Sequence, residues 1–138
     1  MTFPKLAFSK LSLTFITLAF LIFTSNLGFA QSTNPKVKEL TDLTRKYSRY
    51  PDSLEYIGKQ LITFNDSFAK SEGHFALGYS LYQKGQMDLA VLHYDTALMY
   101  TDPDTHYPSY SRIKSNQAIT FQRMGKLDLA KEIYLGLL

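Results

Sequence analysis

The sequence predicts an all-α protein built from antiparallel pairs of helices, and three observations support this prediction. A six-residue word, Gly85-Gln86-Met87-Asp88-Leu89-Ala90, returns 40 residues later as Gly125-Lys126-Leu127-Asp128-Leu129-Ala130. Apolar residues around each copy recur at three- and four-residue steps, which is typical of helices with one buried face. The first 30 residues, in contrast, are rich in apolar side chains and contain no acidic residue. We therefore expect a leader segment followed by about three helical pairs.

The leader, residues 1–30, has the organisation of a secretory signal peptide. Two lysines precede a mainly apolar stretch from Leu11 to Phe23, and small residues at Gly28 and Ala30 occupy the places that signal peptidase requires. Cleavage is expected between Ala30 and Gln31, which leaves residues 31–138 as an exported helical domain, periplasmic or secreted. A retained membrane anchor is the alternative, although the apolar stretch is shorter than the ~20 residues of a spanning helix.

The first helical pair is expected over residues 36–66. The apolar residues that mark it are Val37, Leu40, Leu43 and Tyr47 in one helix and Leu54, Ile57, Leu61 and Phe64 in the next. The second helix should start at Pro51-Asp52-Ser53, because Pro at the first position and an acid in the first turn both favour a helix N-terminus.

The second pair, residues 71–104, has the clearest pattern. Gly85 suits the left-handed conformation that ends a helix, and Asp88 lies in the first turn of the next helix, where a carboxylate interacts favourably with the helix dipole. The apolar positions expected to share faces are Phe75, Leu77, Gly78, Leu81 and Tyr82 before this turn, and Leu89, Ala90, Leu92, Ala97 and Leu98 after it.

The third pair, residues 107–138, repeats this arrangement with Gly125 and Asp128. Between the second and third pairs, Thr101 to Pro108 contains two prolines and several polar residues, which predicts a loop or an early extension of the following helix. The sequence stops at Leu138, inside the last expected helix. We expect either that the natural protein continues or that this helix pairs with another chain, because the end repeats of a stacked array need a cover.

These helical pairs resemble tetratricopeptide repeats, whose pattern has an aromatic residue, Leu-Gly, a second aromatic, then Ala, an aromatic and a closing Pro. The second pair matches with His74, Leu77, Gly78, Leu81, Ala90, Tyr94, Ala97 and, one place late, Pro103. The third matches with Phe121, Gly125, Ala130 and Tyr134 but has Lys114 and Gln117-Ala118 where an aromatic and Leu-Gly are usual. The resemblance implies an α-solenoid of about three hairpins.

In this family, the first helix of each pair lines a concave groove that receives a peptide or a helix. The positions that the resemblance assigns to the groove are Glu72, Phe75, Tyr79, Tyr82, Gln83, Arg112, Ser115, Ile119, Gln122 and Arg123. Tyr and Arg carry binding energy disproportionately, which favours a protein ligand. The alternative is that Phe75 and Tyr79 only pack against the adjoining hairpin. The Lys and Asn that clamp a terminal carboxylate in chaperone-binding members are missing from this set.

Composition and motifs indicate no enzyme. With ten Tyr, ten Phe and no Cys, the chain has no disulfide, Cys nucleophile or cysteine-ligated metal site. Lys5 and Lys10 supply two of the net charges of +3, and no basic run suits nucleic acid. No phosphate loop, nucleophile elbow or zinc-protease motif occurs. We expect no catalytic residue, metal or cofactor.

The three histidines are the remaining candidates for chemistry. His74 is expected to pack between helices, His93 to be partly exposed and His106 to lie in the loop, and no two of them are three or four residues apart on one helix. The sequence therefore favours a protein–protein interaction scaffold. The alternative is the N-terminal sensory fragment of a membrane signalling protein, because a leader followed by such repeats resembles the sensor region of some bacterial histidine kinases and transcriptional regulators.

Overall fold

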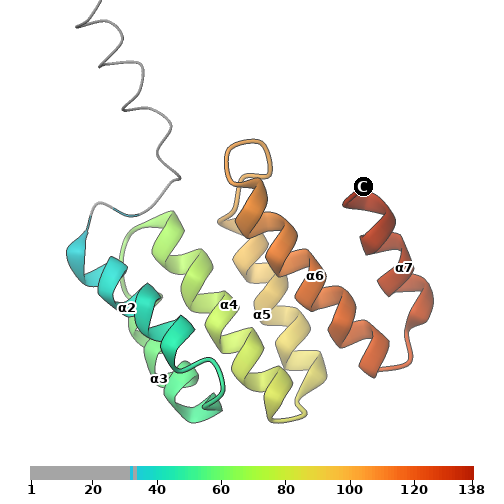
Figure 1. The fold of residues 1–138 in the computed structure, drawn as a ribbon, viewed down its shortest axis with the longest axis horizontal. Coiled ribbons are helices and arrows are strands. Elements are labelled where there is room, and N and C mark those ends of the chain that lie inside the picture. Colours follow the sequence, from blue (N-terminus) through green and yellow to red (C-terminus); the bar gives the residue numbers. More distant parts are fainter. Residues whose placement is uncertain (1–31, 33) are drawn as a thin grey trace, which may run out of the picture.

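The computed structural model describes residue 32 and residues 34–138 (Figure 1). The expected signal peptide and its cleavage position at Ala30 and Gln31 lie outside this part of the chain. The described residues form six helices and no strand: α2 (Pro35–Lys46), α3 (Pro51–Leu61), α4 (Ser67–Gln83), α5 (Met87–Met99), α6 (Tyr107–Arg123) and α7 (Leu127–Gly136). The prediction of an all-α fold is confirmed.

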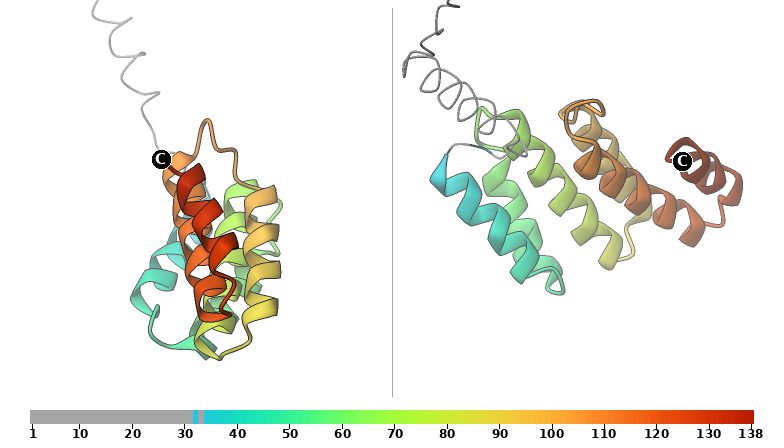
Figure 2. Two further views of the ribbon diagram at one scale, coloured as in Figure 1. Left: turned by 90° about the vertical axis from the view of Figure 1, so that its right-hand side faces the viewer. Right: turned by 45° about the horizontal axis from the view of Figure 1, so that its top comes forward.

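The helices lie in two layers. Figure 1 shows α2, α4 and α6 side by side, with α3 and α5 behind them and α7 at the far end beside α6. The turned views show the same order (Figure 2). Each helix packs against its neighbours in the chain, and the most extensive contacts join α4 to α5 and α3 to α4. Helix α4 is therefore the centre of the fold, since it contacts α2, α3, α5 and α6.

Local sequence signals explain where the helices begin and end. Asn34 caps α2 by accepting a hydrogen bond from the amide of Lys36 at 2.9 Å, and Asp66 caps α4 by accepting one from the amide of Ala69 at 3.0 Å. Gly85 and Gly125 follow α4 and α6 with φ of 78° and 74°, the left-handed conformation expected for them.

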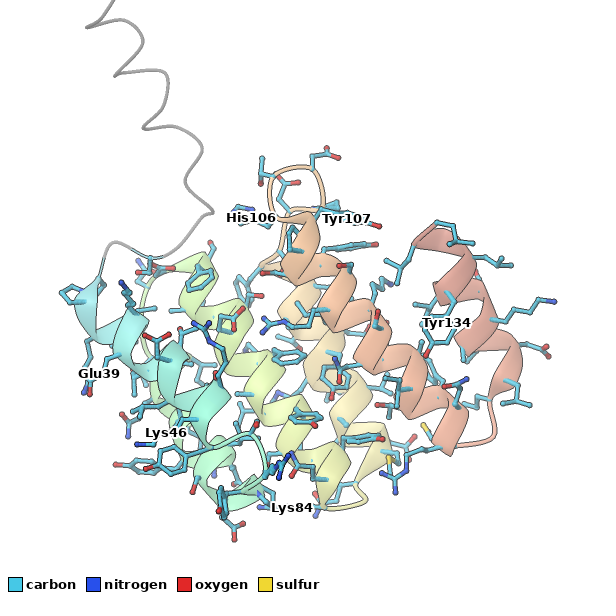
Figure 3. All side chains as sticks on the ribbon, in the orientation of Figure 1. Glu39, Lys46, Lys84, His106, Tyr107 and Tyr134 are labelled. Carbon is cyan, nitrogen blue, oxygen red and sulfur yellow. The ribbon has the colours of Figure 1, made fainter. Side chains whose placement is uncertain are left out.

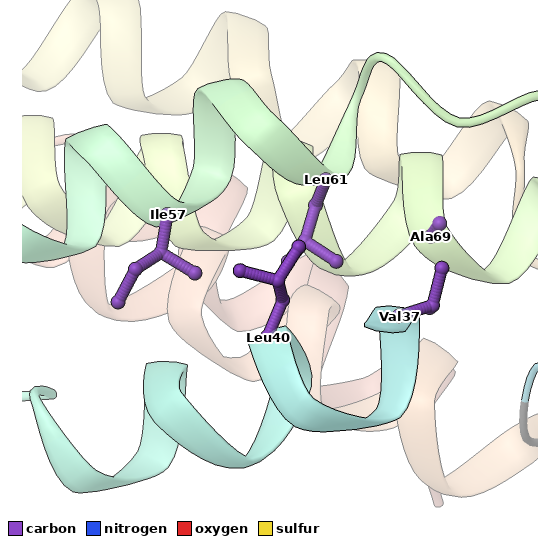
Figure 4. Packing of buried hydrophobic residues seen from close by; sticks show 5 residues of the cluster. All are labelled: Val37, Leu40, Ile57, Leu61 and Ala69. Atoms are coloured by element: carbon purple, nitrogen blue, oxygen red, sulfur yellow. The ribbon is translucent and has the colours of Figure 1, made fainter. Parts of the chain in front are cut away.

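Two apolar clusters form the core. The first joins α2, α3 and α4 through Val37, Leu40, Ile57, Leu61 and Ala69 (Figure 4). The second joins α5 and α6 through Ala90, Tyr94, Ala97 and Ile113. Both clusters consist largely of residues whose three- and four-residue spacing predicted a buried face.

Three expectations about the helices need correction. Helix α3 ends at Leu61, so Phe64 contacts the first cluster from the following turn. Helix α4 begins at Ser67, four residues before the expected start, because Asp66 provides its cap. Leu89 and Leu92 are 50% and 58% exposed, since α5 turns Ala90, Tyr94 and Ala97 towards the core instead.

Glycines allow the helix backbones to approach closely. A Cβ atom on Gly58 of α3 would lie 2.9 Å from the carbonyl oxygen of Gly73 in α4, and the reverse substitution meets the same distance. A Cβ atom on Gly78 would lie 2.8 Å from the ring of Tyr94. The close approach expected at Gly78, with Tyr94 filling the space, is therefore confirmed, whereas the contact of Gly58 with Gly73 was not expected.

The segment between α5 and α6 is a short turn followed by an early start of the helix. Asp102 accepts hydrogen bonds from the amide of Asp104 at 2.9 Å and from the hydroxyl of Thr105 at 3.0 Å, and α6 begins at Tyr107 with Pro108 in its first turn. Both parts of the expectation for this segment are confirmed. Within residues 34–138, no helix combines the length and the apolar character needed to cross a membrane.

Candidate functional site

The residues expected to bind a partner centre on three aromatic rings of α4. Phe75, Tyr79 and Tyr82 lie four and three residues apart and therefore share one face of the helix. The ring centroids of Phe75 and Tyr79 are 6.2 Å apart and those of Tyr79 and Tyr82 are 6.0 Å apart, with interplanar angles of 7° and 10°. We call these three residues the aromatic row. All three are only partly buried, so ring surface remains accessible to a partner.

Two arginines of α6 lie at the ends of the aromatic row. The guanidinium carbon of Arg112 is 4.2 Å from the ring centroid of Phe75, and that of Arg123 is 4.8 Å from the ring centroid of Tyr82. Both distances allow attraction between the cation and the electron-rich face of the ring. The face shared by α4 and α6 thus carries three rings between two cations.

Glu72 connects this face to the interior. Its carboxylate is only 4% exposed and forms an ion pair with Arg112, which lies on the next helix of the same layer. A buried carboxylate needs such a partner because desolvation of an unpaired charge is costly. Glu72, which the family pattern assigned to the groove, therefore contributes to the packing of α4 against α6 and offers little surface to a ligand.

The other expected groove residues are divided among three places. Gln83 donates a hydrogen bond from Nε2 to the carbonyl of Ser48 at 2.9 Å and so closes the turn between α2 and α3. Ile119 is 38% exposed on α6. Ser115 and Gln122 line a hollow shared with α7, where the hydroxyl of Tyr134 donates to Gln122 at 3.4 Å. Figure 3 shows these side chains on the ribbon.

Tyr94 lies beneath the aromatic row and is fully buried. Its ring centroid is 5.9 Å from that of Phe75, and its hydroxyl has no hydrogen-bond partner of normal geometry in the described part of the chain. Burial, together with the nearby Tyr79 and Tyr82, raises the pKa of this hydroxyl well above its usual range. Tyr94 thus supports the rings of α4 mainly through packing.

The fold brings together two histidines that the sequence analysis treated separately. Nδ1 of His74 in α4 lies 3.0 Å from Nδ1 of His93 in α5. The ring centroids are 5.3 Å apart, longer than the nitrogen distance by about the width of one imidazole ring, so the two rings meet edge to edge. One nitrogen must donate and the other accept, which requires different tautomers. The packing of His74 between helices is as expected.

The surroundings of this histidine pair disfavour positive charge. Tyr100 stacks on His74 with centroids 6.1 Å apart, and the ammonium of Lys70 lies 5.4 Å from the Tyr100 ring centroid. Burial lowers the pKa of both histidines, and the proximity of His93 lowers that of His74 further. A count outward from Gly85 places residues 74 and 93 on facing helices of one hairpin, which was the available signal for this contact.

No other cluster of chemical groups stands out. Among the described residues, no group of three or more His, Asp or Glu side chains is arranged to hold a metal ion. Comparison of the chain with protein-family models, with curated proteins and with solved structures finds no match. The assignment of function therefore depends on the residues themselves, and the face that carries the aromatic row is the strongest candidate site.

Proposed function

We propose that this chain is an exported protein-interaction scaffold of the tetratricopeptide-repeat type. In this proposal the pairs α2–α3, α4–α5 and α6–α7 stack as repeats of a solenoid, and the face shared by α4 and α6 binds a segment of another protein. The observation that carries the proposal is the aromatic row with Arg112 and Arg123 at its ends. The signal-peptide pattern of residues 1–30 supports export.

Physical chemistry favours a protein ligand at this face. Tyr and Arg are the residue types that contribute most to binding hot spots, together with Trp. Each ring also offers apolar area with only two rotatable side-chain bonds, so little conformational entropy is lost on binding. The stacking within the row and the two arginines restrict the rings further, which lowers that cost again. We assign a binding role and no catalytic residue.

A peptide library tests this proposal. Peptides selected on the immobilised wild-type chain are measured in solution against Tyr79→Ala and Tyr82→Ala variants. We expect each substitution to weaken binding by about tenfold or more, as hot-spot residues do. Tyr56→Ala is the matched control, because Tyr56 is 68% exposed on α3 and lies outside the row. Equal affinity for wild type and both row variants would remove the proposed face.

Export has its own test. The full chain is expressed in a secreting bacterial host, and the mass of the recovered protein is measured. We expect a mature chain that begins at Gln31, since the small residues before it suit signal peptidase. Recovery of the uncleaved chain from the membrane would support a retained anchor instead.

The second candidate is the sensory part of a membrane signalling protein. The order of a leader followed directly by helical pairs favours it. Nucleotide sequence beyond the codon for Leu138 separates the two candidates. A downstream membrane-spanning segment followed by a kinase or DNA-binding domain supports the sensory role, and an immediate stop codon supports the scaffold.

A further inference from the structure

Helix α7 is much less buried than the other described helices. Ala130 is its only buried residue, whereas each of the other five helices buries three or more. Leu127 and Leu135, two turns apart on α7, are 63% and 60% exposed. Large exposed apolar side chains that share one helix face are a common mark of an interaction surface.

A hollow of about 670 Å³ accompanies this face. The residues that line it are Leu127, Asp128, Ala130, Lys131, Tyr134, Leu135, Leu137 and Leu138 of α7 and its C-terminal end, with Ser115 and Gln122 of α6. The surface thus combines a projecting apolar helix with an adjacent depression. A second α7 can fit such a depression, because the same surface supplies both the ridge and the hollow.

The charges on this surface complement each other. Asp128 and Lys131 lie three residues apart and line the same hollow. Neither side chain takes part in the ion pairs formed within the described part of the chain. In a twofold arrangement with the two helices antiparallel, Asp128 can face Lys131 of the partner subunit, and the reciprocal pair forms by symmetry.

We propose that the α7 face is a twofold interface between two copies of this chain. Leu127 and Leu135 supply its apolar contacts, and Asp128 and Lys131 select the antiparallel orientation through two equivalent ion pairs. A second copy suits this face better than an unrelated segment, since the charge pattern complements itself. The interface is separate from the aromatic row on α4, so dimerisation and ligand binding are measured independently.

The experiment is sedimentation velocity on the purified full chain over ~1 to ~200 μM, a range that covers the affinities of small interfaces. We expect a reversible monomer–dimer equilibrium. A Leu127→Glu, Leu135→Glu double variant should raise the dissociation constant on the order of 100-fold, because two exposed leucines lose their burial. Leu92→Glu is the control: Leu92 is 58% exposed on α5, and its replacement should leave the equilibrium unchanged.

Charge reversal tests the orientation. Asp128→Lys and Lys131→Asp should each weaken the dimer by roughly tenfold, since each places like charges face to face twice. The double reversal should restore wild-type affinity within about threefold. A chain that is monomeric throughout the concentration range overturns the proposal. So does a dimer that survives the Leu127→Glu, Leu135→Glu replacement, and a double reversal without rescue overturns the antiparallel pairing.

Discussion

Glu72 of α4 and Arg112 of α6 form an ion pair in which the carboxylate is buried while the guanidinium lies against the Phe75 ring. The contact joins two helices of the same layer, 40 residues apart in the chain. Arg112 therefore has two roles. It neutralises a charge in the interior, and it holds the first ring of the aromatic row.

Loss of Arg112 should be more damaging than loss of the Glu72 charge. We expect Arg112→Met to lower the free energy of unfolding by about 2 kcal/mol, because it leaves a buried carboxylate unpaired. Glu72→Gln should have a smaller effect, since the guanidinium is 38% exposed and can remain hydrated. Urea unfolding followed by circular dichroism measures both.

Arg123→Met is the control for the contact between cation and ring. Arg123 lies 4.8 Å from the Tyr82 centroid and has no carboxylate partner among the described residues. Its loss should lower the free energy of unfolding by less than about 1 kcal/mol. Equal effects of Arg112→Met and Arg123→Met would show that the ion pair contributes nothing beyond ring contact.

Gly78→Ala should destabilise the protein although alanine favours helices. The added Cβ would lie 2.8 Å from two ring carbons of Tyr94, which is fully buried and cannot move aside easily. Overpacking of this kind costs about 1 to 3 kcal/mol, against a propensity gain of about 1 kcal/mol. Gly136→Ala, where nothing lies within 4 Å of the new atom, should be neutral or slightly stabilising. Thermal unfolding that ranks Gly78→Ala above wild type would contradict this account.

Tyr94→Phe should leave stability unchanged or raise it by up to about 1 kcal/mol, because the buried hydroxyl has no partner to lose. Tyr94→Ala, which removes the ring as well, should cost about 3 to 5 kcal/mol. Urea midpoints of the two variants measure the contrast. A loss above about 1 kcal/mol in Tyr94→Phe would reveal a hydrogen bond, with Thr120 as the nearest candidate.

The contact between His74 and His93 should make stability depend on pH. The folded-state pKa of each lies below the ordinary value of 6.5, so the unfolded chain binds more protons below that pH. The stability contribution is therefore complete above about pH 6.5 and is lost as the pH falls through the folded-state values. Urea midpoints between about pH 7.5 and pH 5 should decline in wild type and decline less in His93→Gln. Parallel declines would exclude the histidine pair as the cause.

Carboxylates respond in a different range and do not obscure this effect. Hydrogen bonds with Lys59 and Lys84 lower the pKa of Glu55 from 4.5 to about 2. Its contribution is present above pH 4.5 and is lost only as the pH falls from there towards 2. A Glu55→Gln variant should therefore retain the histidine-dependent decline and lose part of the decline at lower pH.

Much of the fold could be predicted from local sequence. Gly85 and Gly125 ended helices because the left-handed conformation suits glycine, and Asp88 and Asp128 lie in the first turns that follow. Leu89 and Leu92 were wrongly placed in the core. Periodicity tolerates neighbouring apolar residues on one face, and the position of α4 and α6 decided which line of α5 is buried.

The candidate site was predictable only in part. The spacing of Phe75, Tyr79 and Tyr82 on one helix face follows from helix geometry alone. Which cation meets which ring depends on how α6 lies against α4, and Glu72 moved from the expected surface to the interior for the same reason. Its charge alone suggested exposure, because nothing in the local sequence indicates a partner 40 residues away.

The sequence by itself determined the helices and their turns, since capping, glycine conformation and apolar spacing act over a few residues. It also determined which residues are available for binding. Only the tertiary structure decided that Arg112 pairs with Glu72, that His74 meets His93 and that α7 keeps Leu127 and Leu135 exposed. These outcomes depend on contacts between helices, and such contacts arise from the packing of whole faces rather than from the order of neighbouring residues.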